Sequence, residues 1–154
     1  MIIISPYSKQ LRNGVRPNPK DYPYWQELIE LILKEYPKQV IIQVGVTGEK
    51  EFNKTSVMFN LPLNELKGLV KECDLWISVD NFFHHLASYV GKKGIVLFGQ
   101  SDPLIFGDKN NINILRDRSY LRPNHFDLWE NAKFIPQAFV KPEKVMKEIK
   151  KILT

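Results

Sequence analysis

The segment from Lys71 to Pro103 constrains the fold of this chain more than any other part of the sequence. It contains two short apolar runs, 74–79 and 94–98, and between them a helical pattern over 83–90 that ends at Gly91. Two parallel strands joined by a helix cross over right-handedly, so both strands end at the same edge of their sheet. We therefore predict a β-α-β unit whose polar turns, 80–81 and 99–103, form a ligand-binding edge.

Strand and helix patterns alternate along the rest of the chain. Asp21 is a candidate helix N-cap, and Leu63 is expected on the inward face of the helix that follows Pro62. The predicted strands are 2–4, 39–44, 56–60 and 112–115, and the predicted helices are 21–36, 62–73 and 141–153. This alternation predicts an α/β protein with a doubly wound, mostly parallel, Rossmann-like sheet, formed as a single domain over residues 1–154.

Composition excludes several classes of protein. The chain is 44% hydrophobic and 25% charged, which is typical of soluble globular domains, and it has no apolar run of about 20 residues for a membrane span. Residues 2–4 are expected to be the first strand rather than part of a signal peptide. The single cysteine, Cys73, is expected to be buried and inert; it allows no internal disulfide and fits a cytoplasmic location.

A net charge of +5 raises the question of a polyanionic partner. Much of it comes from lysines near the C-terminus that alternate with apolar residues at helical spacing. We interpret them as the solvated face of the last helix, with a nucleic-acid interface as the less favoured alternative. The loop over 5–21 is different, because its length and its cations (Lys9, Arg12, Arg16 and Lys20) suit an anionic ligand.

Three linked segments resemble the donor-site signature of the heptosyltransferase-like glycosyltransferases, glycosyltransferase family nine. They are SVDNFFHHLA at 78–87, GK at 91–92 and LFGQSDP at 97–103. The family pattern is roughly S-x-D-[ST]-G-x-x-H-L-A, G-K-P and L-F-G-x-[ST]-D-P. Lys20–Pro23 is similar to the K-x-W-P motif that precedes the family's first donor-domain helix, with Tyr22 in the aromatic place. The resemblance implies the C-terminal, donor-binding half of the two-domain GT-B architecture.

The resemblance also implies a set of residues that bind a nucleotide sugar. Turn amides and Lys20 would hold the diphosphate, and Glu49, with Glu51 as reserve, would contact the nucleoside. Asp80 is either a ligand for a sugar hydroxyl or a plain N-cap, and Ser101 either a phosphate ligand or a helix cap. The implied set is Lys20, Glu49, Asp80, Asn81, His85, Gly99, Gln100 and Ser101.

Two features of the motif bear on what the site can bind. Phe82 stands where the family has glycine, and it could block a phosphate or stack on a base or sugar. His84 and His85 are adjacent, so they should point to different helix faces, with one packed against the sheet. Their spacing is not that of a helical metal-ligand pair, and we predict no metal and no cofactor beyond a nucleotide-sugar substrate.

Function depends on what completes the site. In the resembling architecture the other domain binds the acceptor and supplies the catalytic base, and the residues here are all used by the donor domain. We therefore expect glycosyl transfer only with a partner, either a separate acceptor-binding chain or a homo-oligomer, and the catalytic residues stay unknown. A non-catalytic nucleotide-binding module is the alternative, and a nucleic-acid-binding domain the less favoured one.

Overall fold

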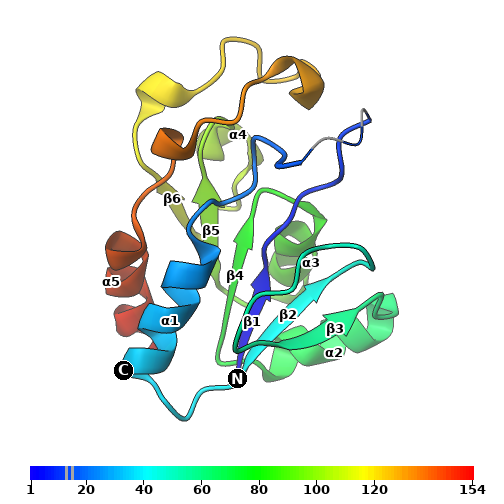
Figure 1. Cartoon of the computed structure of the whole chain (residues 1–154). Coiled ribbons are helices and arrows are strands. Elements are labelled where there is room, and N and C mark those ends of the chain that lie inside the picture. Colours follow the sequence, from blue (N-terminus) through cyan, green and yellow to red (C-terminus); the bar gives the residue numbers. More distant parts are fainter. Residues whose placement is uncertain (13, 15) are drawn as a thin grey trace.

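The computed structural model describes residues 1–12, 14 and 16–154 (Figure 1). Two residues of the loop expected over 5–21, Asn13 and Val15, lie outside the described residues. Six strands form one parallel sheet in the order β3-β2-β1-β4-β5-β6. They are β1 (Ile2–Ser5), β2 (Ile41–Gly45), β3 (Ser56–Phe59), β4 (Leu75–Val79), β5 (Ile95–Phe98) and β6 (Ile112–Leu115). The order is that of the doubly wound Rossmann fold, so the predicted fold class is confirmed.

The β-α-β unit that the sequence predicts consists of β4, α3 (Phe82–Val90) and β5. β4 and β5 are parallel neighbours, with Val79 opposite Leu97. Gly91 ends the helix with a φ of 85°, and its N–H bonds to the carbonyls of Ala87 and Ser88. This left-handed conformation is costly for residues with a Cβ, which explains why glycine ends the helix here.

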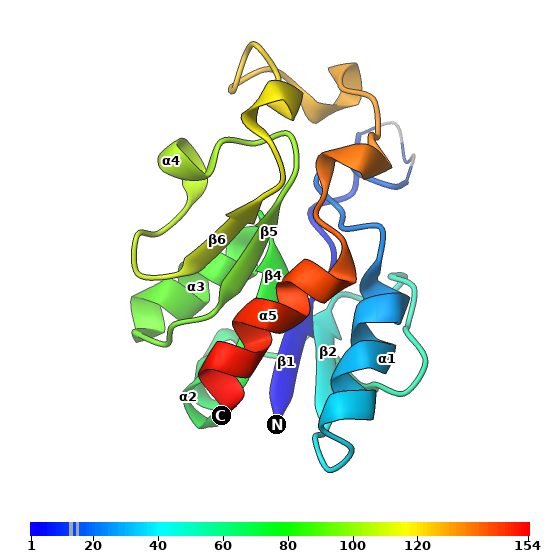
Figure 2. The same cartoon turned by 90° about the vertical axis from the view of Figure 1, so that its left-hand side faces the viewer.

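Helices cover both faces of the sheet (Figure 2). α1 (Trp25–Glu35) and α5 (Pro142–Leu153) pack on one face, and α2 (Leu63–Glu72) and α3 on the other. Successive side chains of a strand point to opposite faces, so Ile2 and Ile4 of β1 enter the first core and Ile3 enters the second. All three isoleucines are fully buried, so β1 is covered on both faces.

Two local expectations were wrong. α1 begins at Trp25 with Tyr24 as N-cap, while Asp21 holds the preceding loop instead of capping a helix. Leu63 is 48% exposed at the start of α2, where only Val70 is fully buried. Each error came from local pattern alone, which does not show how deeply a helix end lies against the sheet.

Apart from β6, the chain between β5 and α5 forms short, irregular elements. α4 (Pro103–Phe106) is a single turn, and three 3-10 turns follow β6. They are η1 (Arg118–Tyr120), η2 (Trp129–Asn131) and η3 (Pro136–Ala138). In both views this segment lies above the carboxyl ends of the strands, on the same side as the loop after β1 (Figures 1 and 2).

The helices themselves are short. Within the ranges 1–12, 14 and 16–154, each is too short or too polar to cross a membrane. The lysines of α5 at 144, 147, 150 and 151 are exposed, as a solvated helix face requires. Cys73 is buried, as expected, and burial raises the pKa of its thiol.

The topology places a crevice between β1 and β4. The chain leaves β1 toward β2 on one side and leaves β4 toward β5 on the other, so the loops that follow these strands diverge. In open parallel sheets this switch point is where ligands bind.

Candidate functional site

A cavity of about 1150 Å³ lies at the carboxyl edge of the sheet, at the switch point. Its walls come from the loop after β1, the turn after β2, the start of α3 and the segment around Trp129. Five of the eight residues expected at a donor site line it: Lys20, Glu49, Asp80, Asn81 and His85. The topology thus brings together side chains that are up to 65 positions apart in the sequence, from Lys20 to His85.

Asp80 is at the centre of the charged part of the cavity. Its Oδ1 lies 3.1 Å from Nε2 of His84, and its Oδ2 lies 3.8 Å from Nζ of Lys20. Burial acts to raise the pKa of Asp80, but the His84 hydrogen bond, the Lys20 charge and the Ser101 side chain outweigh it. The pKa of this carboxyl therefore lies below its ordinary value, and Asp80 is an anion at neutral pH.

The two adjacent histidines have different surroundings. His84 is fully buried and His85 is exposed on the cavity wall, yet their ring centroids are only 3.8 Å apart. Burial and the neighbouring His84 and Lys20 lower the pKa of His85 despite the opposing charge of Asp80, so its ring is neutral near pH 7. The contact between His84 and Asp80 was missed at the sequence level, although their i,i+4 spacing was a signal for it.

Ligand atoms of Asp80, His84 and His85 lie within 4.8 Å of one another, close enough to ask whether they could hold a metal ion. The spacing argument against a metal therefore does not hold, because both rings turn toward Asp80. In the described residues, Oδ1 of Asp80 contacts His84 and Oδ2 lies near the Lys20 ammonium, whereas Nδ1 of His84 is buried without a hydrogen-bond partner. The absence of a metal therefore stays a prediction.

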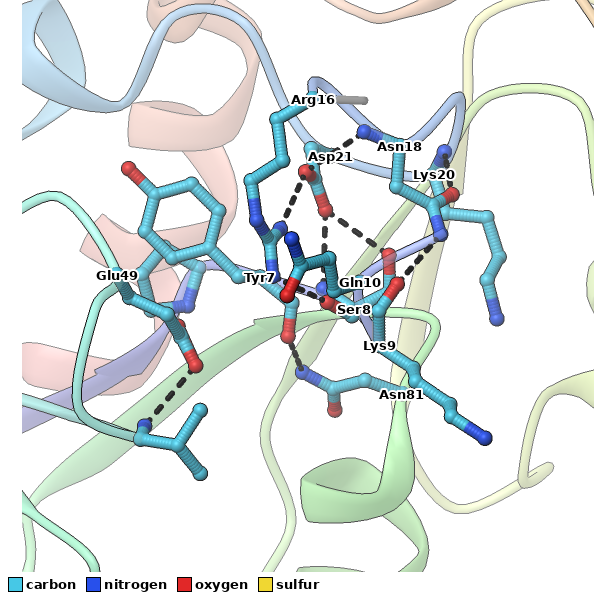
Figure 3. Close-up of polar contacts among 12 residues, drawn as sticks. Tyr7, Ser8, Lys9, Gln10, Arg16, Asn18, Lys20, Asp21, Glu49 and Asn81 are labelled. Atoms are coloured by element: carbon cyan, nitrogen blue, oxygen red, sulfur yellow. Dashed lines mark hydrogen bonds and ion pairs between the residues drawn. The ribbon is translucent and has the colours of Figure 1, made fainter. Parts of the chain in front are cut away.

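Asn81 ties β1 to β4. Its side-chain oxygen accepts hydrogen bonds from the Ser78 hydroxyl and the backbone N–H of His84, which makes it the N-cap of α3. Its amide nitrogen donates to Ser5 Oγ and, as Figure 3 shows, to the Tyr7 carbonyl. Asn81, rather than Asp80, is therefore the helix cap, which leaves the Asp80 carboxylate free for other contacts.

Glu49 lies at the opposite end of the cavity. One carboxylate oxygen accepts from the Val46 N–H at 2.9 Å, drawn in Figure 3, while Oε2 is buried without a partner in the described part of the chain. Burial raises the pKa of Glu49. Burial of the Tyr7 hydroxyl, together with the carboxylates of Asp21 and Glu49, raises the pKa of Tyr7 to about 12. Tyr7 stacks on Phe52 beside it, with ring centroids 5.9 Å apart. Glu51, the reserve candidate, is exposed and outside the lining.

The loop after β1 is held by one buried carboxylate, as Figure 3 shows. Asp21 accepts hydrogen bonds from the Ser8 backbone and hydroxyl, the Asn18 backbone and the Arg16 guanidinium. Burial still raises the pKa of Asp21 above its ordinary value. This network sets the end of the loop where Lys20 reaches the cavity.

The second turn expected to bind an anion, at residues 99–101, makes contacts within the protein instead. Gly99, Gln100 and Ser101 are not among the described residues that line the cavity. A Cβ on Gly99 would lie 2.6 Å from the Phe139 ring, and Gln100 donates to the Lys133 carbonyl at 2.7 Å. The helix expected near Ser101 begins at Pro103 and is capped by Asp102 instead. Ser101 is buried, and its side chain helps to lower the pKa of Asp80.

Arg122 and Trp129 are cavity residues to which the sequence analysis gave no role. The Arg122 guanidinium donates to the carbonyls of His125, Asp127 and Leu128 and lies 3.5 Å from the centroid of the Trp129 ring. Lys20 Nζ lies 5.5 Å from the same centroid. No sequence signal identifies them, because their function depends on how an irregular segment folds back over the sheet.

Phe82, which replaces the family glycine, is the first residue of α3. Its side chain is 67% exposed, so it stands on the cavity wall rather than filling the interior. The cavity beside Lys20 and Asp80 is therefore not filled by Phe82.

A protein-family model, described as glycosyltransferase family 9 (heptosyltransferase), matches residues 18–124, which is more than half of the chain. Among curated proteins, none matches significantly.

Solved structures with the same fold are more numerous. A family 9 glycosyl transferase from Veillonella parvula is 16% identical with a TM-score of 0.71 over 99% of this chain. An E. coli ADP-heptose LPS heptosyltransferase II is 14% identical, with a TM-score of 0.69 over 99% of this chain. E. coli heptosyltransferase WaaC with ADP is 16% identical, with a TM-score of 0.65 over 97% of this chain. The chain spans 46%, 46% and 43% of those three structures, less than half of each.

Proposed function

The chain belongs to glycosyltransferase family 9, and from this premise we propose that it binds the diphosphate of a nucleotide sugar at the carboxyl edge of its sheet. One observation carries the proposal. Lys20 and the N-terminus of α3, at residues 81–83, meet on the wall of one cavity at the switch point of the sheet. A helix N-terminus and a nearby ammonium group are the two features that most commonly hold phosphate in proteins.

Each lining residue then has a role that its environment supports. Lys20 neutralises the diphosphate, and the ionised Asp80 accepts a hydroxyl of the sugar. Glu49, which lines the far end of the cavity, contacts the nucleoside through its carboxylate. The neutral ring of His85 can donate or accept beside Asp80 without adding charge.

We further propose that sugar transfer takes place where this surface meets an acceptor-binding domain. The half-length match to heptosyltransferase structures supports a donor-binding half that is completed elsewhere, by another chain or by a homo-oligomer. At that interface Lys20 and the α3 amides would stabilise the leaving diphosphate. We also propose a cytoplasmic location for the protein, because nucleotide sugars are available there as substrates.

The test is nucleotide binding by the chain alone. We expect ADP, UDP or GDP, or one of their sugar conjugates, to raise the melting temperature, because a ligand at 100 times its Kd stabilises by about 2.7 kcal/mol. ADP is the first candidate, since one similar structure is a complex with ADP. Lys20→Met should weaken binding about tenfold or more, as loss of a charged hydrogen bond costs roughly 1.5–3 kcal/mol.

Lys38→Met is the matched control. Lys38 is exposed in the turn before β2, at the opposite edge of the sheet, so its loss changes the net charge equally but leaves the cavity intact. Equal weakening by both variants would mean that binding depends on charge alone. If no nucleoside diphosphate binds, the proposal fails, and a steep salt-dependent affinity for DNA or RNA would then favour the nucleic-acid alternative.

A further inference from the structure

The Lys20 ammonium group has two neighbours in the cavity, and only one of them is a charge. Nζ lies 3.8 Å from Oδ2 of Asp80 and 5.5 Å from the centroid of the Trp129 ring. The Lys20 side chain is only 19% exposed. A lysine is otherwise a flexible point charge on a four-carbon stem, so two neighbours at this depth restrict where its charge can lie.

Trp129 is itself fixed by Arg122. The guanidinium plane covers the indole at 3.5 Å while its N–H groups hold three backbone carbonyls of the same segment, at residues 125, 127 and 128. Burial lowers the pKa of Arg122, although the group stays charged at any ordinary pH. Because one guanidinium donates to three backbone carbonyls, it holds residues 122–129 in a rigid turn. An isolated, exposed ion pair would not hold the backbone in this way.

The turn is also anchored at its two ends. The Arg122 N–H bonds to the Gln100 carbonyl, and Glu130 accepts from the backbone N–H of Arg12, in the loop that carries Lys20. The cavity wall after β6 and the loop after β1 are therefore tied together beside Lys20. Figures 1 and 2 show both segments on the same side of the sheet.

We propose that Trp129 and Arg122 are positioning residues for anion recognition: Arg122 fixes the indole, and the indole holds the Lys20 ammonium group at the diphosphate position. This inference rests on the proposed function, because it concerns the same anion. A cation over an indole face is attracted by the ring quadrupole, most strongly when water is largely excluded. When an anion binds, it pairs with the Lys20 ammonium group and so changes the electrostatic environment of the Trp129 ring.

The molecule contains its own reporter for this step. Trp25 and Trp76 are buried in the two cores, so of the three tryptophans Trp129 is the one that lines the cavity. Inorganic pyrophosphate is the probe, because it carries the diphosphate without a base or sugar. We expect it to change the tryptophan emission of the full chain, and we expect Trp129→Phe to abolish the change.

Affinity for pyrophosphate, measured by calorimetry, separates positioning from mere packing. Trp129→Ala should weaken binding by about three- to tenfold, and Trp129→Phe should restore most of the loss, since phenylalanine retains a ring face. Arg122→Met should weaken binding similarly, and the double variant should be no weaker than Trp129→Ala, because both act through one ring. Arg122→Lys should not rescue, because an ammonium group cannot reproduce the planar fork.

Tyr89→Ala is the matched control. Tyr89 is 81% exposed and faces Lys67 at 5.3 Å, so it is an aromatic–lysine pair outside the cavity, and its loss should leave pyrophosphate affinity unchanged. The inference is overturned if pyrophosphate binds the wild type without changing tryptophan emission, or if Trp129→Ala binds it normally. Failure of pyrophosphate and of all nucleoside diphosphates to bind the wild type would instead overturn the proposed function.

Discussion

At the residue scale, adjacent polar side chains serve different purposes. Asn81 caps α3 and ties it to β1, so the adjacent Asp80 is spared a capping role and faces the cavity as an anion. His84 is buried and fixes Asp80, while His85 is exposed on the cavity wall. Which member of each pair has its functional group directed into the cavity is decided by side-chain direction, not by residue type.

Gly99 illustrates how a motif residue can be required for packing. A Cβ there would lie 2.6 Å from the fully buried Phe139 ring, so Gly99→Ala should destabilise by about 1–3 kcal/mol in urea unfolding. Gly68→Ala is the control: nothing lies within 4 Å of its Cβ in α2, and alanine there should stabilise by roughly 0.5–1 kcal/mol. If Gly99→Ala kept full stability but lost nucleotide binding, a ligand contact would replace this explanation.

Tyr22 gives a pH dependence with a definite sign. Its hydroxyl is buried and donates to the Val140 carbonyl at 2.9 Å, and burial raises its pKa far above the value of about 10 in an unfolded chain. The stability it contributes is complete below pH ~10 and declines as the pH rises, because only the unfolded state releases the proton. Denaturation followed from pH 8 to 11 should show a steeper alkaline decline for the wild type than for Tyr22→Phe, and parallel curves would contradict the assignment.

At the element scale, the regular elements build the two cores, while irregular segments supply most of the cavity wall. The strands and the four long helices bury the two cores, and the cavity walls come from a loop, a turn and the start of one helix. The segment 118–138 has only single 3-10 turns of its own, so tertiary hydrogen bonds must hold it.

Gln100 is one of these tertiary anchors. It is 4% exposed and its amide donates to the Lys133 carbonyl at 2.7 Å, while its own carbonyl accepts from Arg122. Gln100→Ala should cost about 0.5–1.5 kcal/mol locally, since the partly buried bond to the Lys133 carbonyl is lost. Hydrogen exchange of residues 121–133 should then accelerate while that of α2 stays unchanged. Uniform acceleration throughout the chain would show that Gln100 supports the whole fold instead.

At the scale of the whole molecule, the sheet is an internal layer with a core on each face. β1 is central, and its consecutive residues Ile3 and Ile4 are fully buried in different cores. The site lies above the point where the two halves of the sheet diverge, so its geometry depends on both cores together.

Paired substitutions in β1 test this two-sided burial. Ile3→Ala and Ile4→Ala should each lower the free energy of unfolding by about 2–5 kcal/mol, because each leaves a cavity in a separate core. On a sheet covered on one face only, one of the two would cost little. Urea titration of both variants, with exposed Val40→Ala as the control, distinguishes these cases.

The sequence by itself determined the fold and the edge of the sheet at which the candidate site lies. Alternating apolar strands and amphipathic helices require a doubly wound parallel sheet, and the polar turn at 80–81 has to lie at its carboxyl edge. The resemblance to the family motifs predicted Lys20, Asp80 and His85 as site residues, and all three line the cavity. Tertiary structure alone decided the ion-pair contacts of Asp80, the structural environment of Gly99 and Gln100, and the presence of Arg122 and Trp129 in the cavity. The physical reason is that these depend on long-range packing of irregular segments, and a periodic sequence pattern records only the face of a regular element that is buried.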